Sequence, residues 1–221
     1  MHGGRKSIGG NDLKIAIIIE GSTKMRSLEI ENIVKRLSEH EVFNIGMKKV
    51  DNEPELTYME TGFLTALLLN LKAVDFVIGG CGTGQGYMNM VLQFPGTACG
   101  LLLDSVDAFL YSKVNAGNCI SLALNKGYGG VGADVNVSHM LEKLFDDKFG
   151  EGYPEARREI QINARKKLLQ VSIDAHKPMH EIINCIDQSI IESALKFPGV
   201  VDFIETHAPE SELKKLVMKK V

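Results

Sequence analysis

The segment of the chain best suited to chemistry is the run GGCGTGQG at residues 79–86. It follows an apolar run at residues 74–78, which predicts a buried strand, and it precedes a helical pattern. Ligands of parallel α/β sheets bind at the carboxyl ends of strands, so this position favours a site. Glycines leave backbone N–H groups unobstructed and able to converge on an anion. The alternative interpretation is a glycine-rich turn that only permits close packing between helix and sheet.

Cys81 is the most informative side chain in this segment. We expect it in a loop before a helix N-terminus, where a thiol has a lowered pKa and is partly thiolate near neutral pH. Such a thiolate could act as a nucleophile or as a general base. The other three cysteines, Cys99, Cys119 and Cys185, lie in apolar contexts, and we interpret them as buried structural residues.

The same glycines do not match the common nucleotide-binding motifs. A dinucleotide fingerprint needs G-x-G-x-x-G after the first strand, but the pattern that starts at Gly82 reaches Tyr87 instead of the third glycine. No Gly-Lys-Ser/Thr sequence is present, which excludes a P-loop. We therefore expect no nucleotide cofactor.

Apolar runs that alternate with helical patterns predict an α/β fold. Strands are expected at residues 14–19, 41–45, 74–78, 97–103 and 119–124, with helices at 58–71, 105–116 and 135–146. Near-continuous apolar runs mark strands buried on both faces. The prediction is a three-layer α/β/α Rossmann-like domain with a five-stranded parallel sheet.

The pattern also predicts how the chain is divided. A flexible tail is predicted at residues 1–12. The α/β domain is predicted at residues 13–150, and a C-terminal helical extension at residues 151–221. Within the extension, helices are expected at 154–171 and 179–195, packed on the α/β body or on a neighbouring subunit. A glycine-rich loop at 127–132 follows the fifth strand.

Composition excludes several classes of function. The 221 residues are 44% hydrophobic and 24% charged, and 25 Lys and Arg stand against 28 Asp and Glu, so neither nucleic acid nor an anionic membrane is an expected partner. No apolar run approaches the roughly 20 residues that span a bilayer. The four cysteines form no C-x-x-C pair, which indicates reduced thiols in the cytoplasm and no zinc site. We interpret the basic triplet at residues 165–167 as part of a solvated helix face.

A strand followed by C-G-T-G-x-G and a helix resembles the type B ribose-5-phosphate isomerase and galactose-6-phosphate isomerase family. The similarity covers about residues 13–160 and continues through Asp104, the segment 115–118 and the pair Arg157 and Arg158. The C-terminal helices lie outside the core family pattern and resemble a longer branch of the family.

The resemblance implies metal-free aldose–ketose isomerisation of a sugar phosphate through a cis-enediolate. Carried over, Cys81 is the base that removes the carbon-bound proton, and Thr83 helps to move protons at the O1 and O2 oxygens. Backbone N–H groups around Gly82, Gly84 and Gly86 would stabilise the enediolate. A thiolate base beside an anion-stabilising loop suits proton abstraction next to a carbonyl.

The resemblance also implies binding residues and a partner. Asn115 matches a family position that contacts sugar hydroxyls, and Arg157 matches one that binds the phosphate from a partner subunit. Tyr58 matches an aromatic at the pocket wall. A homodimer or homotetramer with shared active sites is therefore expected.

The sequence departs from the family pattern at four positions. Glu20 and Gly21 stand where the family has Asp-His, Val114 replaces the ring-opening histidine, and Tyr153 replaces an arginine. Glu20 can still accept hydrogen bonds from sugar hydroxyls, and Lys126 is the candidate replacement for a lost positive charge.

The lost imidazoles lead to a hypothesis about the substrate. Without a group that opens a sugar ring, the enzyme would prefer an open-chain sugar such as a tetrose 4-phosphate, whose phosphorylated O4 cannot close a five-membered ring. The alternative is a non-catalytic sugar-phosphate-binding protein of the same fold. Retention of both Cys81 and Thr83 favours the enzyme, because binding alone needs only the glycine backbone.

Overall fold

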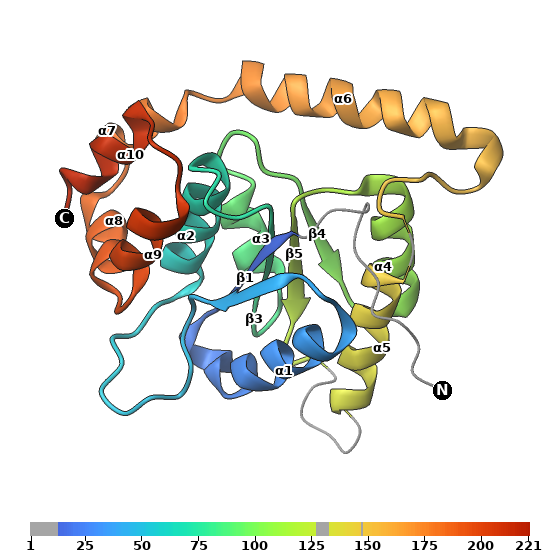
Figure 1. Cartoon of the computed structure of the whole chain (residues 1–221), viewed down its shortest axis with the longest axis horizontal. Helices are drawn as coiled ribbons and strands as arrows, with labels where there is room; N and C mark the ends of the chain where they lie inside the picture. Colours follow the sequence, from blue (N-terminus) through green and yellow to red (C-terminus); the bar gives the residue numbers. More distant parts are fainter. Residues whose placement is uncertain (1–12, 127–132, 147) are drawn as a thin grey trace.

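The computed structural model describes residues 13–126, 133–146 and 148–221. The expected tail at 1–12 and the glycine-rich loop at 127–132 lie outside the described residues. Five parallel strands form one sheet in the order β2-β1-β3-β5-β4 (Figure 1). Their bounds are Lys14–Ile19 for β1, Glu41–Asn44 for β2, Phe76–Cys81 for β3, Cys99–Leu102 for β4 and Cys119–Ala123 for β5. The predicted α/β fold with a five-stranded parallel sheet is confirmed.

The central strand β3 differs from its prediction at both ends. It begins two residues later than expected and continues through Gly79 and Gly80 to Cys81, pairing with β1 on one side and β5 on the other. A Cβ at Gly80 would lie 2.4 Å from the carbonyl oxygen of Leu122, so this close approach of two strands needs a glycine. The expectation that Cys81 lies in a loop is therefore wrong: it is the last residue of the strand.

Helices cover both faces of the sheet (Figure 1). The helices α1 (Ser27–Leu37), α4 (Ser105–Leu110) and α5 (Ala133–Phe145) pack on one face, and α2 (Tyr58–Asn70) and α3 (Gln85–Val91) pack on the other. Side chains of β1 alternate between the two faces, with Ile15, Ile17 and Ile19 toward the first and Ala16 and Ile18 toward the second. This arrangement gives the predicted three layers.

The segment predicted as one helix over 105–116 contains two kinds of helix. After α4 the chain continues as a π-helix, Tyr111–Asn115. The Tyr111 hydroxyl lies between the carbonyl oxygens of Cys119, at 2.6 Å, and Ala98, at 3.0 Å. This ring therefore joins the π-helix to β5 and to the segment before β4.

The C-terminal extension is helical, as predicted, and has more helices than expected. The long helix α6 (Arg158–Ala175) runs across the top of the molecule in Figure 1 to a group of four short helices. These are α7 (Met179–Cys185), α8 (Gln188–Lys196), α9 (Val200–His207) and α10 (Glu212–Met218). The helix predicted over 179–195 is thus two helices, because Asp187 caps a new one by accepting a hydrogen bond from the Ser189 N–H at 2.9 Å.

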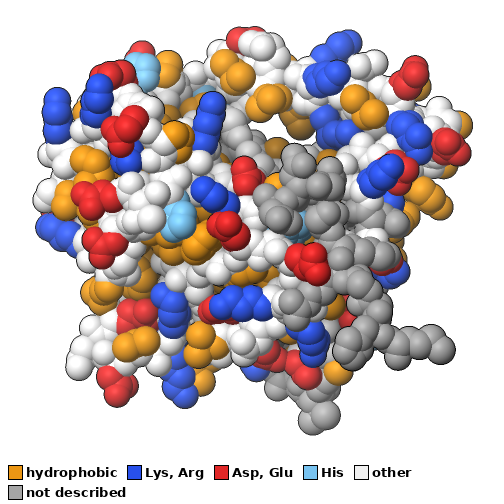
Figure 2. All heavy atoms as spheres, viewed as in Figure 1, with side chains coloured by type: hydrophobic (Ala, Val, Ile, Leu, Met, Phe, Trp, Pro, Cys, Tyr) orange, Lys and Arg blue, Asp and Glu red, His pale blue; other side chains and the backbone are white. Residues whose placement is uncertain are grey.

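The short helices share a hydrophobic core with the α/β body, whereas α6 does not. Buried side chains such as Ile183, Ile191 and Ile204 belong to the same cluster as Leu64 and Leu67 of α2. By contrast, α6 has no buried residue and shows both apolar and basic side chains on its surface (Figure 2). Among the described residues, no helix is long and apolar enough to cross a membrane.

Candidate active site

The predicted site residues from two strands meet at the carboxyl end of the sheet. Ile19 of β1 pairs with Gly80 of β3, so Glu20 and Cys81 directly follow paired residues at the carboxyl ends of neighbouring strands. The strand order changes direction between β1 and β3, because β2 lies on one side of β1 and all later strands lie on the other. Ligands of open α/β sheets bind at such a switch point.

Glu20 is a buried carboxylate held in one orientation. It is only 7% exposed and caps the 3-10 helix Gly21–Arg26. Its side chain accepts a hydrogen bond from the Ser22 N–H at 3.0 Å and a second from the Ser22 hydroxyl. The carboxylate therefore remains fixed beside the end of β3.

The Cys81 thiol and the Thr83 hydroxyl face each other. Cys81 is 6% exposed, and its Sγ lies 3.9 Å from Thr83 Oγ1. The Gln85 N–H donates to the same hydroxyl oxygen at 3.3 Å, which orients the threonine at the start of α3. The structure thus brings together the two residues that were predicted to carry the chemistry.

The glycine-rich loop is tied closely to β3 and β5. Gly84 has a φ of +72°, its N–H donates to the Cys81 carbonyl oxygen at 3.2 Å, and its own carbonyl oxygen accepts from the Ser121 hydroxyl at 2.5 Å. Its N–H is thus engaged inside the loop. The expected stabilisation of an anion by N–H groups around Gly82 and Gly86 stays a prediction.

Tyr58 and Lys126 come from other elements at the same end of the sheet. A Cβ at Gly86 would lie 3.2 Å from the Tyr58 ring, so this ring covers the loop from the first turn of α2. Tyr58 is 43% exposed, which suits an aromatic at a pocket wall. Lys126 is exposed and follows the carboxyl end of β5.

Asn115 and Arg157 do not join this site within one chain. Asn115 lies four residues before the first residue of β5, at the amino end of the sheet. The register pairs Val77 with Cys119 and Cys81 with Ala123, so about 13 Å of strand separates that end from Cys81. Arg157 is exposed and ends a short 3-10 helix directly before α6.

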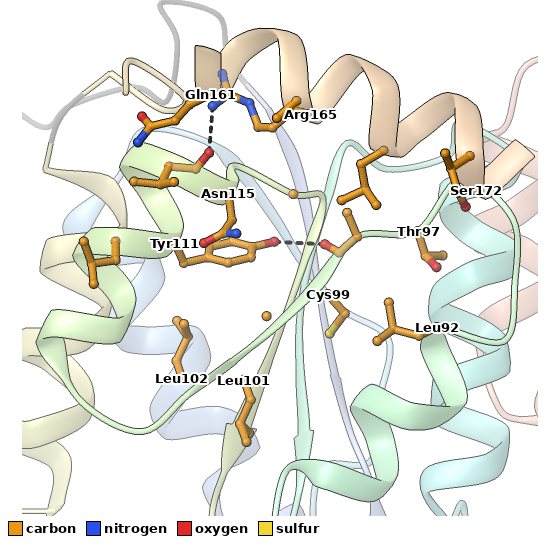
Figure 3. Close-up of a pocket in the computed structure, with 18 of the residues that line it drawn as sticks. Leu92, Thr97, Cys99, Leu101, Leu102, Tyr111, Asn115, Gln161, Arg165 and Ser172 are labelled. Carbon is orange, nitrogen blue, oxygen red and sulfur yellow. Dashed lines mark hydrogen bonds between the residues drawn. The ribbon is translucent and has the colours of Figure 1, made fainter. Parts of the chain in front are cut away.

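Asn115 instead lines a cavity beneath α6 (Figure 3). The cavity has a volume of about 890 Å³, and edge strand β4, the π-helix and α6 form its walls. Leu101, Val114 and Leu168 are among its apolar lining residues, and Gln161 and Arg165 add polar groups from α6.

Arg165 corrects the prediction of a solvated basic triplet. Its guanidinium donates to the carbonyl oxygens of Val114 and Gly150, each at 2.7 Å. Partial burial lowers the pKa of Arg165 from its usual value. No signal in the sequence distinguishes it from Lys166 and Lys167, because the partners come from distant segments.

The remaining cysteines have other surroundings. Cys119 is buried, with its Sγ 3.6 Å from the Tyr87 hydroxyl. A hydrogen bond to Cys119, together with burial, raises the pKa of the partly buried Cys99 thiol well above its usual value. Cys185 is exposed at the end of α7, so its predicted burial is wrong.

These features define a class of protein. A thiol and a hydroxyl face each other at the switch point of a parallel sheet, and a fixed carboxylate follows the neighbouring strand, which is an arrangement suited to moving protons on a small polar ligand. Within the described residues, no three His, Cys, Asp or Glu side chains are grouped so that they could hold a metal ion.

Comparison with known proteins identifies the family. The sequence model of the Ribose/Galactose Isomerase family matches residues 18–162, which is more than half of the chain. A solved ribose-5-phosphate isomerase from Vibrio parahaemolyticus is 36% identical, with a TM-score of 0.90, and the match covers 96% of this chain and 100% of that one. The chain therefore belongs to the ribose/galactose isomerase family and is an aldose–ketose isomerase.

Two further structures show the range of the family. A 4-deoxy-L-threo-5-hexosulose-uronate ketol-isomerase in complex with tartrate is 35% identical, with a TM-score of 0.89, and the match covers 94% of this chain and 98% of that one. The type B ribose 5-phosphate isomerase of Leishmania infantum shares the fold, with a TM-score of 0.61 at 17% identity. The match covers 75% of this chain and 99% of that one. Among curated proteins, none matches this chain.

Replacement of Gly84 by alanine tests how tightly the loop is held. Gly84→Ala places a Cβ 2.5 Å from Leu101 Cδ1 at a positive φ, whereas Gly199 has a φ of +85° and open space around it. We expect Gly199→Ala to cost about 1–2 kcal/mol from its backbone conformation alone, and Gly84→Ala about 2–5 kcal/mol because overpacking is added. Urea unfolding of both variants measures the difference, and equal losses would contradict the packing described.

Proposed function

We propose that this isomerase interconverts the aldose and ketose forms of a small open-chain sugar that carries an acidic group. The observation that carries the proposal is the Cys81 thiol, 3.9 Å from the Thr83 hydroxyl and next to the fixed carboxylate of Glu20. The membership of the chain in an isomerase family supports the same reaction class.

In the proposed reaction, Cys81 acts as the base. Its thiolate takes the proton from C2 of the aldose, the electron pair forms a C1–C2 double bond, and O1 gains the negative charge. O2 then gives its proton to the Thr83 hydroxyl as that hydroxyl gives its own proton to O1. The proton on Cys81 returns to C1, and the ketose results. Backbone N–H groups of the glycine-rich loop stabilise the enediolate between these steps.

The remaining residues at this end of the sheet bind the sugar. Glu20 accepts hydrogen bonds from sugar hydroxyls, and the Tyr58 ring covers the chain of carbons. Lys126 attracts the acidic group of the substrate. No metal takes part in this proposal, because the thiol and the hydroxyl together carry every proton transfer.

The acidic group is a phosphate or a carboxylate. Two relatives with more than 30% identity are named for a ribose phosphate and for a hexosulose uronate, and both substrates are acidic sugars. The absence of an imidazole at Gly21 and at Val114 supports a substrate that needs no ring opening. A tetrose 4-phosphate and an open-chain uronate both meet this requirement.

A second copy of the chain completes the site in this proposal. Asn115 lies at the end of the sheet opposite to Cys81. Arg157 belongs to the same region, because its neighbour Arg158 pairs with Glu151, which also pairs with Lys113 of the π-helix. Both residues therefore reach a substrate only from another protomer. The helix α6 supports such an assembly, since large apolar side chains are exposed along it: Ile160, Leu168, Leu169, Val171 and Ile173. A homodimer is the smallest assembly that shares sites in this way, and a homotetramer would contain two such pairs.

The four free cysteines support a reducing, cytoplasmic location.

The base is tested by Cys81→Ala in an assay that contains excess chelator. We expect turnover of one member of a panel of tetrose 4-, pentose 5- and hexose 6-phosphates and open-chain uronates. The variant should lose at least about 1,000-fold in kcat while its affinity for the substrate stays nearly unchanged, because only the proton acceptor is removed. A variant that keeps its activity would refute the role of Cys81, and binding without any turnover by the natural chain would favour a non-catalytic sugar-binding protein.

Sharing of sites between chains is tested by mixing two inactive variants, Cys81→Ala and Asn115→Ala. A mixed dimer has one site with both substitutions and one site with neither. Random exchange makes half of the dimers mixed, so turnover should recover to about a quarter of the natural activity. Recovery that stays at the level of the separate variants would show that each site belongs to one chain.

A further inference from the structure

Gly21 is a buried glycine whose missing side chain is replaced by another residue. It follows Glu20 directly, at the carboxyl end of β1. A Cβ at this position would lie 1.7 Å from Oε1 of Glu55 and 2.4 Å from its carboxyl carbon. The Glu55 carboxylate therefore occupies the space in which a side chain at position 21 would begin.

Backbone and side-chain contacts hold Glu55 at this place. The Gly21 N–H donates to the Leu56 carbonyl oxygen at 2.8 Å, and Leu56 is fully buried. On its other side, Oε2 of Glu55 lies 3.6 Å from the ammonium group of Lys24. These contacts fix the segment before α2 against the end of β1.

The position of Glu55 also leaves its charge accessible. Its side chain is 61% exposed, so the carboxylate covers Gly21 with one oxygen and faces solvent beside the site. An ion pair at this exposure contributes at most about 1 kcal/mol to stability. Stability alone therefore gives little reason for a carboxylate that requires a glycine beneath it.

We propose that Glu55 is a substrate-binding residue that determines specificity. It accepts hydrogen bonds from sugar hydroxyls on the β1 side of the site, next to Glu20 and three residues before Tyr58. Two carboxylates on this side repel an acidic group, so the phosphate or carboxylate of the substrate points away from β1. This inference rests on the proposed function, because it assigns a residue to the same site.

The test compares kcat and KM for Glu55→Ala, Glu55→Gln and Gly21→Ala with the natural chain. Loss of a charged hydrogen-bond acceptor should lower kcat/KM by about 10- to 100-fold in Glu55→Ala, chiefly through KM. Glu55→Gln keeps the shape and one acceptor, so it should lose less. Gly21→Ala should match Glu55→Ala, because its new Cβ displaces the carboxylate.

The double variant Gly21→Ala with Glu55→Ala shows whether the two changes act through one contact. Without the glutamate side chain the clash disappears, so the double variant should stay within about 2-fold of Glu55→Ala alone. Glu53→Ala is the matched control from the same segment, since its carboxylate accepts from the Lys48 N–H at 2.9 Å instead of covering Gly21. This control should remain within about 2-fold of the natural chain.

Three outcomes separate this inference from the proposed function. If Cys81→Ala abolishes turnover while Glu55→Ala stays within about 2-fold of the natural chain, the role of Glu55 is wrong and the isomerase stands. If Gly21→Ala lowers kcat/KM by the same factor in the Glu55→Ala variant as in the natural chain, the proposed displacement of the Glu55 carboxylate is wrong. If the natural chain turns over no sugar, calorimetry with four- to six-carbon sugar acids decides: weaker binding by Glu55→Ala supports the role, and equal binding overturns it.

Discussion

The close packing of β3 between its neighbours is the constraint on which the site depends. Gly80 allows the strand to approach the Leu122 carbonyl oxygen, and Gly79 leaves room for the Tyr87 ring, which a Cβ would meet at 2.0 Å. The Tyr87 hydroxyl in turn lies 2.6 Å from the Thr65 hydroxyl of α2. Gly79 therefore lets α3 and α2 pack onto the end of the strand, where Cys81 is the last residue before the loop that carries Thr83.

The same packing keeps two buried tyrosines uncharged. Burial raises the pKa of Tyr87 and of Tyr111 well above the usual value, so both phenols stay neutral. Their hydroxyls serve as hydrogen-bonding groups that join the helices to β5 and to the segment before β4. By contrast, the charged groups Glu20, Glu55 and Lys24 lie around the end of β1, at the carboxyl end of the sheet. This separation places the polar chemistry at one edge of an apolar core.

Local features of the sequence could be predicted well. The apolar runs identified all five strands, most directly β1, β3 and β5, because strands buried on both faces need continuous apolar sequence. The contact between Cys81 and Thr83 was also predictable, since the two residues are only two positions apart in the sequence. The break between α7 and α8 was missed although Asp187 gives a local capping signal, because the apolar spacing continues across it.

Features that depend on distant segments could not be predicted. Glu55 meets Gly21 across 34 residues, and Arg165 meets Val114 across 51, so neither partner is visible in a local pattern. The separation of Asn115 from Cys81 follows from the direction of the strands, which places the residue before a strand and the residue after its neighbour at opposite ends. Exposure of Cys185 depends on how α7 lies on the body.

Solvent deuterium exchange tests the central claim, that Cys81 moves a proton through an enediolate. The substrate is converted in D2O by the natural chain and by Cys81→Ala, and deuterium at C1 and C2 is followed by NMR. A thiol exchanges its proton with solvent, so the natural chain should introduce deuterium at the carbon that is protonated, and the variant should introduce none. Turnover with complete retention of the carbon-bound hydrogen would contradict the account, because it would indicate direct transfer between the two carbons.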